Sequence, residues 1–251
     1  MAITIRWSLA ACGVFLALCA AAAEPTATQV VVRVQAHDAK FIGSGVGEMN
    51  IRIEDADSGA LLASGRISGG TGDTGRLINQ PISRGATLAD DKTAAYVANL
   101  NLTRPTRIRI VAVGPLQPSH AAQEISTTTW VVPGRPITGD GIVLNMPGLI
   151  VSPKPQPARG KELPLIADVT LMCGCPITRG GLWNAADYEV RAMVSREGGA
   201  TSEATLEFTG ETNRFAGSVP LAVPGRYEIT LWAHAAKTGN TGAARYTIDV
   251  P

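Results

Sequence analysis

Two cysteines separated by a single glycine, Cys173 and Cys175, are the residues of this chain best suited to chemistry. A thiolate is both a nucleophile and a soft metal ligand. On an extended backbone, residues two apart direct their side chains to the same side, so both sulfurs can reach one partner. Met172 precedes the pair, and Pro176 stiffens the chain that leaves it. The motif therefore predicts a small site built on sulfur.

The sulfur motif predicts a metal site that also includes a tryptophan and a histidine. Trp183 follows in the same connection and could cap an ion with its ring, and His234 ends a later predicted strand. Thiolate, thioether and imidazole ligands suit Cu(I) first and zinc second. We therefore expect Met172, Cys173, Cys175, Trp183 and His234 to hold Cu(I), in a binding or delivery protein with no catalytic residues and no other cofactor.

The same residues admit three other interpretations. Two nearby thiols in an oxidising compartment can form a disulfide, although a ring closed over one residue is strained and easily reduced. The pair can instead serve as a thiol–disulfide redox partner, with Arg179 favouring a thiolate. Finally, Cys173 follows the inward phase of the preceding strand, and His234 shares the phase of Trp232, which favours water. In that case the protein is a structural or interaction module of the cell envelope.

The chain begins with the pattern of a secretory signal peptide. Arg6 precedes an uncharged run, 7–23, that ends in four alanines. A basic start, an apolar middle and an A-x-A end are typical of a cleaved leader, and the run is shorter than most membrane-spanning helices. We expect cleavage after Ala23 and a periplasmic or secreted protein without a transmembrane segment. Lipobox-like contexts at Cys12 and Cys19 leave lipidation as an alternative.

The balance of charges argues against nucleic acid as a partner. The full chain has 22 basic and 21 acidic residues, and loss of Arg6 with the leader would make these numbers equal. A chain without a basic surplus cannot neutralise many phosphates. We expect another protein of the cell envelope as the partner.

Composition and short apolar runs predict an all-β fold made of two β-sandwiches. Valine, isoleucine and threonine recur in alternating segments bounded by glycine and proline, and no long run has helical spacing. The proline-rich stretch 151–162 favours an extended spacer. We expect a signal peptide at 1–23, a sandwich domain at 24–150, the linker at 151–162 and a second sandwich domain at 163–251.

The expected strands also place two connections at one end of the second domain. Neighbouring strands of such sheets are antiparallel, so the strands 163–172 and 226–234 should end at the same pole. The connection 173–187 and the turn 237–241 would then lie together. The expected strands are 28–36, 49–53, 61–68, 94–102, 107–113, 124–132 and 142–150, then 163–172, 188–196, 201–208, 214–221, 226–234 and 243–250.

Two segments resemble known families. Residues 224–234 and the turn 239–242 resemble the last hairpin of bacterial immunoglobulin-like or fibronectin-III-like domains. In such domains a tyrosine corner braces the sandwich, and Tyr227, just after a Pro-Gly turn, would take that place. Residues 51–62 resemble the transthyretin-like or carboxypeptidase-regulatory sandwich. This second resemblance implies a seven-strand sandwich used for binding or spacing, without a catalytic set.

Overall fold

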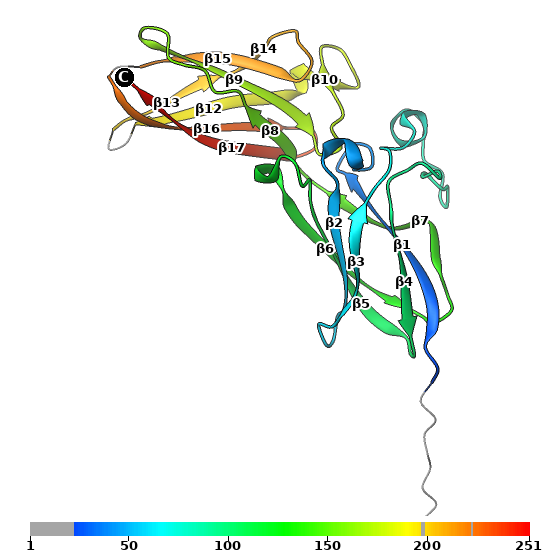
Figure 1. Ribbon diagram of the computed structural model, residues 1–251. Coiled ribbons are helices and arrows are strands. Elements are labelled where there is room, and N and C mark those ends of the chain that lie inside the picture. Colours follow the sequence, from blue (N-terminus) through cyan, green and yellow to red (C-terminus); the bar gives the residue numbers. More distant parts are fainter. Residues whose placement is uncertain (1–22, 197–198, 222) are drawn as a thin grey trace, which may run out of the picture.

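A computed structural model of the protein describes residues 23–196, 199–221 and 223–251. Its main elements are strands, so the predicted all-β fold is confirmed, and the strands form two sandwiches set at an angle to each other (Figure 1). The predicted signal peptide lies outside the described residues, except for Ala23. Within the described ranges, no helix is long and apolar enough to cross a membrane.

The first sandwich consists of β1 to β7, all within the described chain. One sheet has the order β4-β1-β7 and the other the order β3-β2-β5-β6. β7 runs parallel to β1, and the other pairs are antiparallel. The strands are β1 (Thr26–Ala36), β2 (Met49–Asp55), β3 (Leu61–Ile67), β4 (Tyr96–Leu102), β5 (Thr106–Gly114), β6 (Gln123–Val131) and β7 (Ile137–Met146).

The second sandwich packs two four-stranded sheets, with the orders β13-β12-β16-β17 and β14-β15-β9-β8. A short parallel pair, β10-β11, lies in the connection between β9 and β12. The strands are β8 (Leu149–Pro153), β9 (Glu162–Leu171), β10 (Ile177–Thr178), β11 (Trp183–Asn184), β12 (Tyr188–Arg196), β13 (Thr201–Thr205), β14 (Glu207–Phe208), β15 (Arg214–Pro220), β16 (Gly225–Ala235) and β17 (Asn240–Val250).

Alternating side chains build the core of each sandwich. In β9 every second residue from Leu163 to Leu171 is buried, and β16 shows the same alternation from Tyr227 to Ala235. Full burial of one large aliphatic side chain is worth about 1.5–3 kcal/mol, which fixes the face that each strand turns inward. Buried residues of both sandwiches form one continuous apolar cluster. The two units therefore share a core at the place where they meet.

The chain passes from one sandwich to the other at Pro147-Gly148, between β7 and β8. This lies before the expected linker at 151–162. In that stretch β8 already pairs with β9, and the backbone N–H of Lys154 donates to the carbonyl of Ile166 at 2.9 Å. Prolines are tolerated there because β8 is an edge strand, where a missing N–H costs no ladder bond. The proline-rich stretch thus lies along the second sandwich instead of spacing the two units.

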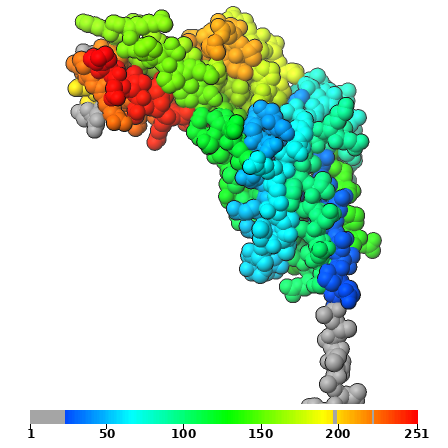
Figure 2. Space-filling model, in the orientation of Figure 1, coloured from blue at the N-terminus to red at the C-terminus, as the bar shows by residue number. Residues whose placement is uncertain are grey.

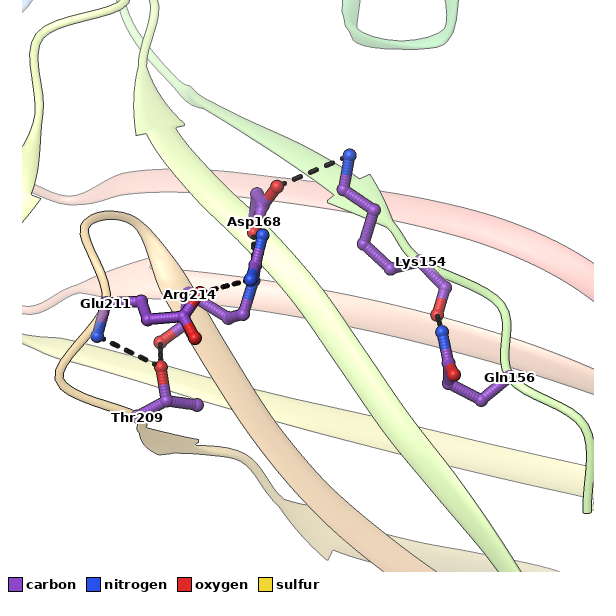
Figure 3. A network of polar contacts seen from close by, with 6 residues as sticks. All are labelled: Lys154, Gln156, Asp168, Thr209, Glu211 and Arg214. Carbon is purple, nitrogen blue, oxygen red and sulfur yellow. Dashed lines mark hydrogen bonds and ion pairs between the residues drawn. The ribbon is translucent and has the colours of Figure 1, made fainter.

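Ion pairs on the outer face of β9 hold this stretch against the sheet. The Lys154 ammonium lies 3.3 Å from a carboxylate oxygen of Asp168, and the guanidinium of Arg214 lies 3.1 Å from the other (Figure 3). Glu211 also pairs with Arg214. The hydrogen bond and the charge of Asp168 raise the pKa of Arg214. The cluster marks a solvated face, as alternation predicts.

The predicted tyrosine corner is present. The Tyr227 hydroxyl donates a hydrogen bond to the carbonyl of Val223 at 2.6 Å, and its ring is buried in the core. The corner ties the start of β16 to the chain that precedes it. By contrast, the Tyr246 hydroxyl in β17 is buried without a hydrogen-bond partner in the described part of the chain.

These two tyrosines give a matched test of the corner. We expect Tyr227→Phe to lower the free energy of unfolding by about 1–2 kcal/mol, because it leaves the Val223 carbonyl without its donor. Tyr246→Phe should be neutral or stabilising, since it removes a hydroxyl that is already unpaired. Urea unfolding of both variants measures the difference, and equal losses would contradict the assignment.

Candidate functional site

Cys173 and Cys175 are joined to each other by a disulfide in the turn that follows β9. Their Cα atoms lie 5.4 Å apart, and their side chains are only 4% and 5% exposed. Gly174 between them has a φ of 76°, a left-handed conformation that glycine adopts without strain. Of the interpretations that the sequence left open, the disulfide is therefore the one present in this structure.

Backbone hydrogen bonds fix the connection that carries the disulfide, residues 172–187, which we call the disulfide loop. The Gly174 N–H donates to the carbonyl of Leu171 at 2.7 Å. Further along, Ile177 and Asn213 form a pair of hydrogen bonds, one of them to the Asn213 side chain. The Asn184 side chain accepts from the Gly180 N–H at 2.9 Å. The loop is thus held at both ends as well as by its sulfurs.

Four of the five predicted site residues belong to the disulfide loop by their position in the sequence, and the fifth, His234, lies outside it. Met172 is fully buried beside the cysteines, and Trp183 is 8% exposed. His234 lies in β16 between the buried residues Ala233 and Ala235, so it points to the opposite, outer face of its sheet. The expectation that His234 joins the sulfur ligands therefore does not match its place in the strand.

The disulfide loop and the turn after β16 share one end of the second sandwich, as the alternating strand directions predict. Tyr188 at the start of β12 pairs with Ala235 at the end of β16. Beside them, the Lys237 ammonium lies 2.7 Å from the Asp187 carboxylate. Burial raises the pKa of Tyr188 to about 12, and the negative charges of Asp38 and Asp187 add to this effect. Because Asp38 belongs to the first sandwich, this end of the domain faces the other unit.

The disulfide loop packs directly on the first sandwich. The indole N–H of Trp183 donates to the carbonyl of Asp38 at 3.1 Å, so this side chain bonds to the first sandwich. A Cβ atom built on Gly174 would come within 2.5 Å of Cγ1 of Val46, which shows how closely the turn approaches that side chain. Val46 belongs to a short 3-10 turn, η1 (Ser44–Val46). The space-filling view shows the two sandwiches meeting at the bend (Figure 2).

A second set of contacts completes this junction, which we call the joint. The Asn240 side chain is 2% exposed and bridges the two units. Its carbonyl oxygen accepts from the Gly148 N–H at 2.8 Å, and its amide donates to the carbonyl of His37 at 3.0 Å. His120 makes a further contact of 2.7 Å between its Nε2 and the carbonyl of Val151. The joint is therefore both apolar and hydrogen-bonded.

Sequence reasoning missed three residues that make contacts at the joint, namely Asp38, Val46 and Asn240. Two of these contacts end on backbone carbonyls, which every residue type offers. Asn240 follows a glycine in a predicted turn, where asparagine is common for local reasons. The types of these residues therefore carried no signal of a contact between domains.

The cysteine pair provides no thiolate ligands for Cu(I) in the observed state. The sulfurs of Cys173 and Cys175 are bonded to each other and thus offer no thiolate in this state. Within the described residues, no three His, Cys, Asp or Glu side chains gather closely enough to hold a metal ion. Met172 and the two cysteines would still provide soft ligands after reduction. A Cu(I) site stays a prediction for the reduced protein.

No protein-family model matches this chain, and a comparison with curated proteins finds no relative. Among solved structures, the alpha chain of the chicken interferon gamma receptor is similar over 92% of this chain and 100% of its own, with 14% identity and a TM-score of 0.35. A marsupial T cell receptor matches over 88% and 71%, with 11% identity and a TM-score of 0.27. The fimbrial anchor protein Mfa2 of Porphyromonas gingivalis matches over 90% and 82%, with 13% identity and a TM-score of 0.20. At these identities and TM-scores, none of the three similarities supports a statement about the function of this chain.

The close approach of Gly174 to Val46 can be tested by adding one methyl group. We expect Gly174→Ala to lower the melting temperature clearly, because the methyl group meets both a left-handed φ and the Val46 side chain. Gly180→Ala is the control, since its φ of 66° is similar but nothing lies within 4 Å of the added atom.

Adding Val46→Ala to Gly174→Ala should recover the part of the loss that comes from the clash. Thermal unfolding of the three variants separates the two causes. The contact is not supported if Gly174→Ala and Gly180→Ala cost the same, or if Val46→Ala gives no recovery.

Proposed function

We propose that the protein is an exported interaction module of the cell envelope, in which the disulfide loop holds two immunoglobulin-like sandwiches as one bent body. The observation that carries this proposal is the placement of the buried cysteine pair. Its turn packs against Val46, and Trp183 of the same loop bonds to the first sandwich. The residues best suited to chemistry are thus used to fix the relative position of two domains.

The short connection between the sandwiches supports the same function. Only Pro147 and Gly148 separate β7 from β8, and the Gly148 N–H is held by Asn240. Proline fixes one backbone dihedral, so little rotation is left in the link. A module that presents two binding faces at a constant angle needs such a link. The transthyretin-like resemblance of residues 51–62 also implies binding or spacing.

Export and an envelope partner follow from the leader pattern and the disulfide together. Residues 1–23 have the pattern of a cleaved signal peptide, and disulfides persist in oxidising compartments such as the periplasm. A thiol–disulfide exchange role receives less support, because exchange requires an accessible sulfur and both of these are buried. We therefore place the protein in the periplasm or outside the cell, with another envelope protein as its partner.

The proposal predicts that the disulfide keeps the joint closed. Replacing Cys173 and Cys175 together by serine should lower the free energy of unfolding by about 1–2 kcal/mol, as expected for a very short cross-linked loop. It should also broaden the distribution of angles between the sandwiches, measured by small-angle scattering, and speed proteolysis near Pro147. Wild-type protein without reductant is the reference. A double variant with the scattering profile and protease resistance of the wild type would refute the proposed role.

A Cu(I) site is the second candidate function, because three sulfur-containing side chains occur together in one buried turn. After reduction, the protein should bind one Cu(I) ion, and Cys175→Ser should abolish binding. His234→Ala should leave it unchanged, since His234 lies on the outer face. Mass spectrometry of the loaded protein provides the measurement. Absence of bound copper in a protein with two free thiols would end this proposal.

A further inference from the structure

A hollow of about 420 Å³ lies in the second sandwich between the start of β12 and the region where β13 passes to β14. The disulfide loop forms one of its walls. Arg179 and Asn184 of the loop line it, together with Tyr188 and Glu189 at the start of β12. The opposite wall comes from the segment that joins β13 to β14. Its volume lies within the range of small-ligand and peptide sites. We call this hollow the loop pocket.

The loop pocket exists because the chain changes sheets at Leu206. β13 pairs with β12 in one sheet, whereas β14 pairs with β15 in the other. The Leu206 N–H donates to the carbonyl of Val190 at 2.9 Å, and beyond this point no strand covers that edge of β12 in the described residues. Backbone groups two residues apart point to the same side of a strand, so the carbonyl of Tyr188 faces the uncovered edge. An extended chain could add itself there.

The floor of the loop pocket is apolar. Val190, Leu206 and Phe215 line it and are 1–2% exposed. Phe208 is half-buried at its side and meets Phe215 edge to face, with ring centroids 5.5 Å apart and an angle of 63°. This arrangement leaves a concave surface, not a flat exposed ring. Such a surface fits one aliphatic or aromatic side chain.

The rim of the loop pocket carries charges of both signs, with an excess of negative charge. Arg179 and Glu207 are exposed, and neither has an ion-pair partner in the described residues. Glu189 lies 3.7 Å from Arg191, but the closer partner of Arg191 is Glu203 at 3.0 Å. Two carboxylates are therefore available beside the apolar floor. A ligand that complements them carries a cation next to an apolar group.

We propose that the loop pocket binds an extended peptide segment of a partner protein, with an apolar side chain followed by a lysine or arginine. The apolar side chain occupies the floor, the cation pairs with Glu207 and Glu189, and a peptide carbonyl or carboxylate meets Arg179. A peptide N–H reaches the carbonyl of Tyr188, in the manner of a strand added to a sheet edge. This inference rests on the proposed function as an interaction module and gives it a site.

Charge reversal at Glu207 tests the proposal. The probes are two capped tetrapeptides, threonine-leucine-lysine-threonine and the same sequence with glutamate in place of lysine. Titrated into ¹⁵N-labelled full-length protein at low salt, the lysine peptide should shift the amide signals of Leu206, Glu207 and Phe208. Glu207→Lys should weaken this binding at least tenfold and make the glutamate peptide the tighter ligand. Glu228→Lys, a reversal away from the pocket on the outer face of β16, should leave the lysine peptide unaffected.

Three results would overturn the assignment. The first is that millimolar lysine peptide shifts none of these amide signals. The second is equal binding of both peptides to the wild type. The third is tighter binding of maltose, a neutral sugar, in the same pocket. Scattering of the same samples reports the joint separately. A closed joint with an empty pocket would therefore reject the peptide site and leave the proposed function standing, whereas an open joint in the wild type would reject the function itself.

Discussion

The contact between the disulfide loop and the first sandwich is the interaction on which this structure depends. A buried sulfur pair shapes the turn, a glycine brings its backbone against Val46, and Trp183 donates to the Asp38 carbonyl. Each contribution is modest by itself. Together they bury apolar surface and satisfy polar groups at the same place, which is how packed interiors achieve a unique arrangement. The two sandwiches consequently share one core.

The same loop serves two surfaces. Trp183 and the turn at Gly174 contact the first sandwich at the joint, and Arg179 and Asn184 line the loop pocket. A change in the conformation of the loop would therefore alter both the angle between the sandwiches and the shape of the pocket. This arrangement gives a physical reason for a disulfide that closes over a single residue, because a loop shared by two surfaces needs little freedom.

The sequence allowed most strands to be predicted, but not the joint or the break at Pro147-Gly148, which interrupts the strand expected at 142–150. The strand predicted at 188–196 is observed at Tyr188–Arg196, because alternation and flanking turn residues are local properties. The linker was expected at 151–162 because alternate prolines favour a spacer. Instead Pro153 ends the edge strand β8, and the next two prolines lie in the connection to β9. The joint depends on backbone carbonyls and on residues distant in sequence, so no local sequence pattern predicts it. The disulfide was among the alternatives, but the position of its turn against Val46 was not.

The two-residue connection at Pro147-Gly148 has a consequence for motion in solution. A flexible tether lets two domains reorient independently, each with the short correlation time of a small particle. Here proline, the Asn240 hydrogen bond to Gly148 and the shared core leave no such tether. The molecule should tumble as one anisotropic particle. The NMR relaxation rates of either sandwich would then report the rotational diffusion of the whole molecule.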